Sequence, residues 1–217
     1  MIQPPARAAA ALLRRRDALG AAAGLLATAM AGNAWGCALE GDDVVLLRSA
    51  LNVAYPQALN VLGAVSSARR SGRIDRWRGL DEPTSPNERR DERARIEASL
   101  GQLRARLAAA TPAGAPALSI VLVEPMLWSR LVPKGARLGL AVHVGGPARG
   151  DVVAVTDEPV IASLNEGRLT AGDALALDLV RLYGRPVQVE SVRAWLERGD
   201  ETGAVAQRPS PNSVAVN

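Results

Sequence analysis

Residues 151–184 read DVVAVTDEPVIASLNEGRLTAGDALALDLVRLYG, and their pattern predicts a strand, two helices and a second strand. One apolar run opens the stretch and another closes it, and Asp157 and Thr170 are favourable N-cap residues for the two segments between them. Gly167 follows the first of these segments, as glycine often does after the last turn of a helix. We therefore expect strands over 151–156 and 179–183, and helices over 157–167 and 170–177.

The strand pattern continues toward the N-terminus of this stretch. Three earlier apolar runs, separated by turn-forming residues at 134–135 and 145–147, predict strands over 119–124, 126–132 and 138–144. On the other side, an amphipathic helix is expected over 188–198. From Gly199 onward the content of Gly, Ser, Pro and Asn predicts a loose tail.

The element order of residues 151–184, with the Gly-Arg-Leu-Thr turn at 167–170, resembles the C-terminal half of the sterol-carrier-protein fold. In that α/β fold, helices cover one face of a sheet around an apolar ligand tunnel. The strands predicted between 119 and 144 fall where the fold has its earlier strands, and Asp178 stands where the family usually has Gly. The resemblance implies a domain that binds lipids or other apolar molecules, and it brings no catalytic residue with it.

The N-terminal half has the pattern of helices. Residues 42–74 are expected to form two helices joined at Tyr55–Pro56, because apolar residues recur at three- and four-residue spacing after Pro56. The alternative for Val44–Leu47 is a short strand.

A third helix is expected to begin at an N-cap of Thr84 or Ser85 and to run to about Ala110. Its apolar residues form a narrow stripe that suits packing against one neighbour. The stripe consists of Ile96, Leu100, Leu103 and Leu107.

Together these elements predict an α+β fold, in which a helical N-terminal region packs on a small, mainly antiparallel sheet with covering helices. The segment TPAGAPA at 111–117 marks the boundary between the two parts. We expect a signal peptide over 1–34, a helical region over 35–110, a linker over 111–118, a sterol-carrier-like domain over 119–198 and a flexible tail over 199–217.

The first 34 residues have the pattern of a bacterial export signal. Basic residues precede the apolar run Ala18–Ala31, which is shorter than the roughly 20 residues that span a bilayer. Arg15-Arg16-Asp17-Ala18-Leu19 resembles the twin-arginine motif, and an ordinary Sec signal with a basic head is the alternative. We therefore expect a mature protein in the periplasm, cut after Ala31 or Ala34.

Cys37 is the single cysteine of the chain, so an intramolecular disulfide and a cysteine-built metal site are excluded. It follows Ala34-Trp35-Gly36, which matches a lipobox in part. Cys37 is therefore either a lipidated anchor or an unpaired thiol of a soluble product.

The formal net charge of +4 does not indicate nucleic-acid binding. Four of the basic residues and one acid lie within residues 1–34, so the mature chain is nearly neutral. Eleven arginines against seven acids gather in residues 69–106, and acids predominate over 147–203. The arginine-rich helix either docks on an acidic protein partner, through Arg89, Arg93 and Arg104, or is a solvated face. Only six aromatic residues are present, which argues against stacking on nucleic-acid bases.

The sequence contains few residues suited to catalysis. His143 is the single histidine, so a hydrolytic triad or a histidine-based metal site has no alternative base or ligand. Glu124 and Asp151 flank the predicted strands, and solvated carboxylates are the simpler interpretation of both. We lean toward a protein without enzymatic activity and expect no cofactor and no metal.

The leading hypothesis is an exported periplasmic protein that binds an apolar small molecule or lipid. Its alternative is an accessory or assembly subunit that docks on an exported enzyme through the arginine-rich helix. The candidate ligand-binding residues are Trp128, Val142, Leu164, Leu175 and Trp195, of which the two tryptophans are alternatively core or interface residues.

Overall fold

The computed structural model describes residues 44–75, 85–135 and 137–206. The expected signal peptide at 1–34 and the candidate lipidation site Cys37 lie outside these residues. Export and lipidation therefore stay predictions. Within the described residues, no helix is both long enough and apolar enough to cross a bilayer.

Five strands form one sheet in the order β3-β2-β1-β4-β5. β1 pairs in parallel with β4, and the other neighbouring pairs are antiparallel, which confirms the expected α+β class and the mainly antiparallel sheet. The strands are β1 (Leu118–Leu122), β2 (Leu127–Lys134), β3 (Arg137–Val142), β4 (Val152–Thr156) and β5 (Arg181–Tyr183).

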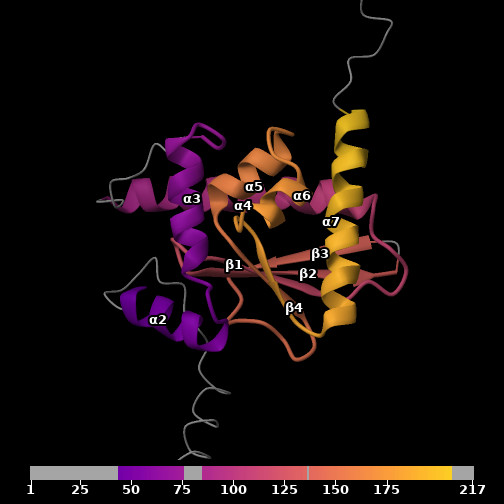
Figure 1. Ribbon diagram of the computed structural model, residues 1–217, viewed down its shortest axis with the longest axis horizontal. Coiled ribbons are helices and arrows are strands. Elements are labelled where there is room, and N and C mark those ends of the chain that lie inside the picture. The colour runs from indigo at the N-terminus through magenta and orange to yellow at the C-terminus, as the bar shows by residue number, and fades with distance from the viewer. Residues whose placement is uncertain (1–43, 76–84, 136, 207–217) are drawn as a thin grey trace, which may run out of the picture. The chain divides into compact units, whose positions relative to one another are not determined.

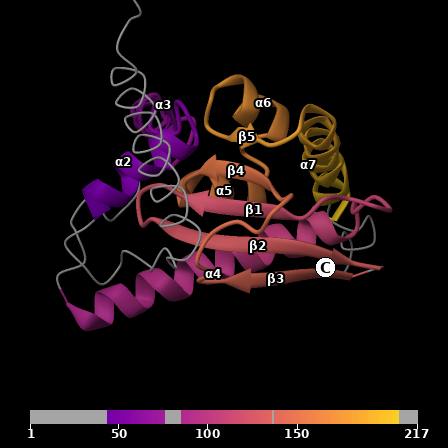
Figure 2. The same cartoon turned by 90° about the horizontal axis from the view of Figure 1, so that it is seen from below.

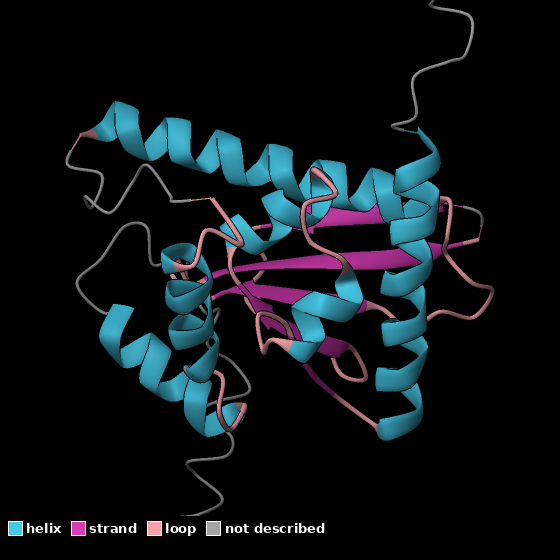
Figure 3. Cartoon of the chain, turned by 45° about the horizontal axis from the view of Figure 1, so that its top comes forward, coloured by secondary structure: helices cyan, strands magenta, loops and turns pink. Residues whose placement is uncertain are grey.

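The helices lie before, between and after the strands of this sheet (Figure 1). Seen from below, the strands lie in front of α4 and α5, while α3, α6 and α7 follow one another along the β5 side (Figure 2). α7 crosses the C-terminal end of α4 (Figure 3). The described helices are α2 (Val44–Ala54), α3 (Asn60–Arg70), α4 (Pro86–Ala108), α5 (Glu158–Asn165), α6 (Ala171–Ala176) and α7 (Pro186–Ala206).

Side-chain caps start three of these helices where the sequence predicts them. Ser85 Oγ accepts from the Glu88 amide at 3.2 Å, and Glu88 Oε2 accepts from the Ser85 amide at 3.0 Å, so a full capping box opens α4. Asp157 and Thr170 accept from backbone amides of the first turns of α5 and α6, at 3.0 Å each. These caps confirm the predicted starting points of the three helices.

The register of the sheet assigns each strand residue to one of two faces, because side chains alternate along a strand. Ile120 pairs with Ala154, and this face is turned toward α4, α5, α6 and α7. Val121 pairs with Trp128 and with Val155 on the opposite face. β1 and β4 are buried along their whole length, so both faces of the sheet centre are covered.

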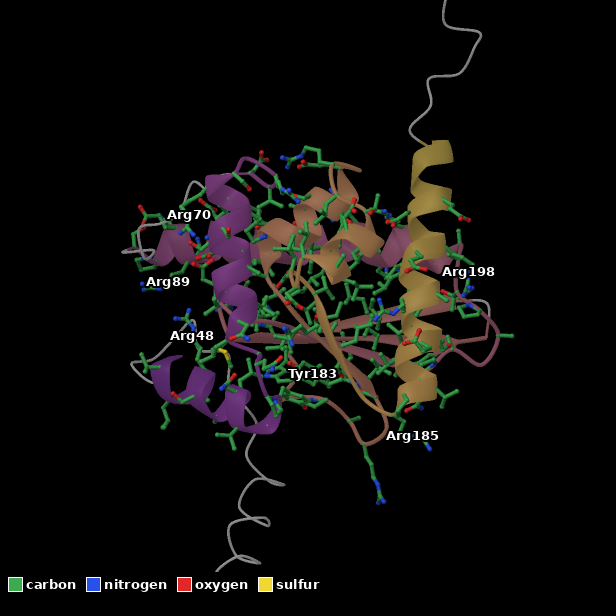
Figure 4. All side chains as sticks on the ribbon, viewed as in Figure 1. Arg48, Arg70, Arg89, Tyr183, Arg185 and Arg198 are labelled. Carbon is green, nitrogen blue, oxygen red and sulfur yellow. The ribbon has the colours of Figure 1, made fainter. Side chains whose placement is uncertain are left out.

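The segment between α2 and α3 covers the second face. The Tyr55 ring lies 6.1 Å from the Trp128 ring and 5.3 Å from the Tyr183 ring, between centroids. Tyr183, labelled in Figure 4, donates its hydroxyl hydrogen to the Pro56 carbonyl at 2.7 Å. The predicted helical N-terminal region therefore packs on the sheet through a small aromatic cluster.

Val44–Leu47 belongs to α2, which confirms the expected helix and excludes the alternative of a short strand. Two sequence-based boundaries are wrong. Leu118, assigned to the linker, is a buried residue of β1. The tail predicted from Gly199 begins later, because α7 continues to Ala206.

Asp200 explains why α7 continues past Gly199. The Arg106 side chain of α4 donates to the Asp200 carboxylate and, at 3.0 Å, to the Gly199 carbonyl. Asp200 Oδ2 also accepts from the Ala171 amide at 2.7 Å, and so gives a hydrogen-bond partner to an amide in the first turn of α6, which has no partner within the helix. Tertiary contacts therefore hold a segment whose composition predicts a loop.

Asp178 has a φ of 57°, in the left-handed region that glycine adopts without strain. This is the position where the resembled family usually has Gly. Both Asp178→Gly and Asp178→Val remove the 3.0 Å ion pair with Arg181, so the difference between the two variants isolates the backbone conformation. We expect the Gly variant to be more stable than the Val variant by about 1 kcal/mol or more, measured by urea unfolding. Equal stabilities would contradict the backbone assignment.

Candidate apolar ligand site

A cavity of about 30 Å³ lies between the sheet and the covering helices. β1 and β4 contribute its floor, α4 and α5 one side, and α6 and α7 the cover. Its lining residues are Leu103, Leu118, Ile120, Ala154, Thr156, Ile161, Leu164, Ala171, Leu175, Val180 and Leu196.

The cavity surface is apolar. Thr156 is the single lining residue with a polar side chain, and its Oγ1 donates to the Leu179 carbonyl at 2.9 Å. That hydroxyl group is therefore engaged with the backbone. None of the lining residues has a charged side chain. Such a site suits hydrocarbon and excludes ions, because an unpaired charge in an apolar environment is costly.

α6 and the segment after it form the cover of the cavity. α6 has only six residues, and it contributes Ala171 and Leu175 to the lining, while Val180 follows it. Its polar anchors are the Ala171–Asp200 hydrogen bond at its start and the Thr156–Leu179 hydrogen bond after its end. A short helix with few anchors is the part of this wall that moves at least cost.

The structure brings two of the five predicted ligand-binding residues to the cavity, Leu164 and Leu175. Val142 is half-buried on β3 and does not line the cavity. Trp128 lies on the opposite face of the sheet, against Tyr55, because the pairing with Val121 sets its direction. Trp195 is buried between α7 and α4 and donates from Nε1 to the Leu107 carbonyl at 3.1 Å. The two tryptophans are therefore core residues, which was the alternative interpretation.

The three predicted docking arginines differ in exposure. Arg104 is exposed on α4, whereas Arg89 and Arg93 are half-buried and engaged with neighbouring groups. The hypothesis of a protein partner on this helix stays a prediction, and it depends mostly on Arg104.

Glu124 is not the solvated carboxylate that the sequence suggests. Arg69 Nη2 of α3 donates to Glu124 Oε2 at 3.1 Å, and Arg48 of α2 donates to the Glu124 carbonyl and, at 3.1 Å, to the Val123 carbonyl. Asp157, only 1% exposed, lies beside Glu124. These groups form a charged cluster at the C-terminal ends of the parallel strands β1 and β4.

Asp151, at the opposite end of β4, is also engaged. Arg130 donates to its two carboxylate oxygens at 2.7 and 2.9 Å, and Ser119 Oγ donates to Oδ2 at 2.5 Å. Burial works to raise the pKa of Asp151, but the hydrogen bonds from Arg130 and Ser119 hold it below its usual range. Asp151 is therefore an ionised structural carboxylate.

Asp157 is a protonated acid near neutral pH. Burial first, and then the neighbouring Glu124 carboxylate, raise the pKa of Asp157 to about 8. Asp157 still serves as the N-cap of α5, because its Oδ1 accepts from the Glu158 amide. Among the described residues, no group of three or more His, Cys, Asp or Glu side chains has the arrangement of a metal site.

His143 does not form part of this cluster. Its Nε2 lies 3.0 Å from Glu97 Oε1 of α4, and both side chains are partly exposed. The residue follows β3 with a φ of 58°, so it stands outside the regular alternation that the sequence suggests.

Comparisons with known proteins found similar solved structures among sterol carrier proteins. No protein-family model and no curated protein matches the sequence. The crystal structure of sterol carrier protein 2 like 2 from Aedes aegypti is similar at a TM-score of 0.36 and 19% identity, over 47% of this chain and 96% of that one. The palmitated form from the same organism, solved by NMR, gives a TM-score of 0.36 and 20% identity, over 46% and 93% of the two chains.

A third similar structure comes from Thermus thermophilus. It is a conserved hypothetical protein described as possibly a sterol carrier protein, with a TM-score of 0.34 and 23% identity, over 55% of this chain and 90% of that one.

Sequence reasoning missed most of the cavity lining, although a signal for part of it was present. Ile120, Ala154 and Thr156 lie on two predicted strands, where alternation assigns residues two positions apart to one face, and Leu118 precedes the first of these strands in the same alternation. The small side chain of Ala154, within a strand of larger apolar residues, indicates that space is left beside that strand. Leu103 and Leu196 come from helices whose crossing the sequence does not reveal.

The raised pKa of Asp157 makes stability depend on pH. In the folded protein Asp157 binds a proton up to about pH 8, whereas the unfolded chain releases it near the ordinary aspartate pKa of 3.8. The folded state therefore binds more protons between these values, and the free energy of unfolding falls as pH rises from about 4 to about 8. Asp157→Asn keeps the cap and removes the titration, so we expect a flatter pH dependence and higher stability at pH 8.

The measurement is urea unfolding from pH 5 to pH 8.5. Asp91→Asn, which replaces an exposed acid of α4, is the matched control and should keep the wild-type slope. An Asp157→Asn protein with the wild-type slope would show that Asp157 is ionised in the folded state.

Proposed function

We propose that this chain is an exported, non-enzymatic periplasmic protein that binds an apolar small molecule or lipid between its sheet and helices α4–α7. One observation carries the proposal, namely the cavity whose lining is apolar apart from the hydrogen-bonded Thr156. The resemblance of residues 151–184 to sterol-carrier proteins implies the same class of ligand. The export-signal pattern of residues 1–34 supports the periplasmic location.

The cavity is small in this structure. A volume of about 30 Å³ has room for little more than one methyl group or water molecule, so a ligand enlarges it. The most readily displaced wall is α6 with the segment after it, for the reasons given above. Burial of the hydrocarbon of the ligand supplies the driving force, at roughly 25 cal/mol per Å² of apolar surface.

The first test is native mass spectrometry of the mature protein purified from the periplasm. We expect a bound apolar molecule, or binding of added dodecanol, an uncharged probe with one hydrocarbon chain. Protein that carries no ligand and binds no dodecanol would contradict the proposed function.

A cavity-filling variant locates the site. Ala154→Val adds two carbon atoms to the cavity floor, where Ala154 is 4% exposed. We expect it to stabilise the free protein by about 1 kcal/mol and to weaken dodecanol binding at least roughly fivefold, because the same space is filled in advance. Unfolding by urea and titration calorimetry measure the two effects.

Ala141→Val is the matched control, because it makes the same change at an exposed position of β3 that does not line the cavity. It should leave dodecanol binding unchanged. Wild-type affinity in the Ala154→Val protein would place the ligand elsewhere.

A further inference from the structure

β3 is an edge strand of the sheet, because the strand order is β3-β2-β1-β4-β5. Figure 2 shows it as the outermost strand on the side away from β5. Within the described residues, β3 pairs with β2 alone. Its other side therefore presents backbone donors and acceptors that a further strand could bind.

The hydrogen bonds between β2 and β3 show which backbone groups lie on that open side. The Val144 amide donates to the Trp128 carbonyl at 3.1 Å, so Trp128 directs its backbone groups toward β3. This direction alternates along a strand, so every second residue after Trp128 in β2 also bonds to β3. The register partners of these β2 residues on β3 are Ala141, Gly139 and Arg137.

The other residues of β3 direct their N–H and C=O groups to the open side. These residues are Leu138, Leu140 and Val142. Pro133 agrees with this assignment, because it pairs with Leu138 in the register and has no N–H to donate to β3. The three open-side residues share one face of the strand, on which Leu138 is buried and the other two are half-buried.

The middle of β3 lacks the features that usually protect an edge strand from pairing. Residues 138–142 read LGLAV, without a charged residue or a proline. The other edge strand, β5, has only three residues and is followed at once by Gly184-Arg185-Pro186, where α7 begins. Short length, charge and proline are the common protections of an edge, so β5 is protected and β3 is open.

A second copy of the chain complements this edge in an antiparallel arrangement. Pairing centred on Leu140 places Leu140 opposite itself and Leu138 opposite Val142 of the second copy, so apolar side chains meet apolar side chains. Each of these pairs joins open-side groups, which gives roughly six backbone hydrogen bonds across the interface. On the other face Gly139 lies opposite Ala141 of the second copy, and neither side chain is large enough to keep the strands apart.

The two ends of β3 carry opposite charges. Arg137 begins the strand, is exposed and has no hydrogen bond or ion pair within the part of the chain that the structure describes. Lys134, its register partner on β2, is also exposed. Beyond the other end, the carboxylate of Glu97 lies 3.0 Å from His143 and its side chain is 46% exposed. A two-fold axis through Leu140 brings the basic end of each strand beside the acidic end of the other, so charge favours this orientation.

We propose that β3 pairs with β3 of a second copy about a two-fold axis at Leu140, so that two five-stranded sheets join into one continuous sheet. The contact is isologous and therefore closed, because each copy uses its single open edge. None of the β3 residues lines the apolar cavity, so the inference is independent of the proposed function.

The first test is sedimentation equilibrium of the mature protein over about 5–200 µM, the range in which moderate affinities are measured. We expect the wild-type protein to dimerise. Ala141→Lys adds a charge at an exposed position of the edge, beside Arg137 of the second copy, and should weaken the dimer at least roughly tenfold. Ala148→Lys is the matched control, the same change at an exposed position in the loop before β4, and should dimerise as the wild type does.

A backbone variant tests the hydrogen bonds themselves. Leu140→Pro removes an N–H that does not bond to β2, so the sheet within each copy keeps its hydrogen bonds. We expect loss of the dimer with an unchanged circular dichroism spectrum. Ala141→Lys decides the question by itself if the proline variant does not fold.

Amide hydrogen exchange locates the interface. The open-side amides of Leu138, Leu140 and Val142 should exchange more slowly at the high end of the concentration range than at the low end in the wild-type protein. In Ala141→Lys they should exchange at the same fast rate at both concentrations, because the edge stays unpaired.

A charge swap tests the two-fold arrangement. Arg137→Glu and Glu97→Arg should each weaken the dimer, by roughly threefold to tenfold, because like charges then meet at both ends of the paired strands. The combined variant restores opposite charges and should return to within about threefold of the wild-type affinity.

Three results would overturn the inference. The first is a wild-type protein that stays monomeric over the whole concentration range. The second is a dimer that survives both Ala141→Lys and Leu140→Pro, which would place the contact between copies elsewhere. The third is protection of the open-side amides only when a different protein is added, which would assign the edge to an extended segment of that protein. A failure of dodecanol binding would sink the proposed function and leave this inference standing.

Discussion

The parallel pairing of β1 with β4 is the constraint on which the rest of the structure depends. Both strands are buried on both faces, so apolar side chains alone do not choose between neighbouring registers. One polar side chain does, because Ser119 of β1 donates to the carboxylate of Asp151, which directly precedes β4. A shift by one residue would leave the buried Ser119 hydroxyl without this partner, at a cost of about 1–3 kcal/mol. The observed register directs Ile120 and Ala154 to the apolar cavity and Val121 and Val155 to the opposite face.

The same register places the charged cluster at the ends of the two parallel strands, and the cluster in turn positions α2 and α3. Arg48 and Arg69 converge on Glu124 from these two helices, with Asp157 buried behind it. A third attachment, the Tyr55 ring, lies against Trp128 and Tyr183 on the far face of the sheet. Because these attachments use both helices and their connection, they hold α3 in place. The position of α3 is therefore a consequence of electrostatics and aromatic packing at the ends and the far face of the sheet.

The local elements were predictable from the sequence, and their tertiary relations were largely not. The caps at Ser85, Asp157 and Thr170 act within one turn, so residues a few positions apart predict them. Leu164 and Leu175 were found because an apolar periodicity marks a buried helix face. Trp128 was misplaced because its face depends on pairing with β1, and α7 was cut short because Asp200 is held by Arg106, far away in the sequence. The interpretation of Glu124 as a solvated carboxylate was wrong for the same reason, since its partners lie on α2 and α3.

The small size of the apolar cavity follows from the cost of empty apolar space. An empty cavity lined by hydrocarbon stays dry, and each additional Å³ costs on the order of 24 cal/mol, so the small cavity costs under about 1 kcal/mol and one sized for a whole chain would cost several. A ligand chain that displaces residues 175–180 would fill the enlarged space as it forms, so burial of its hydrocarbon would offset the cost of opening that space.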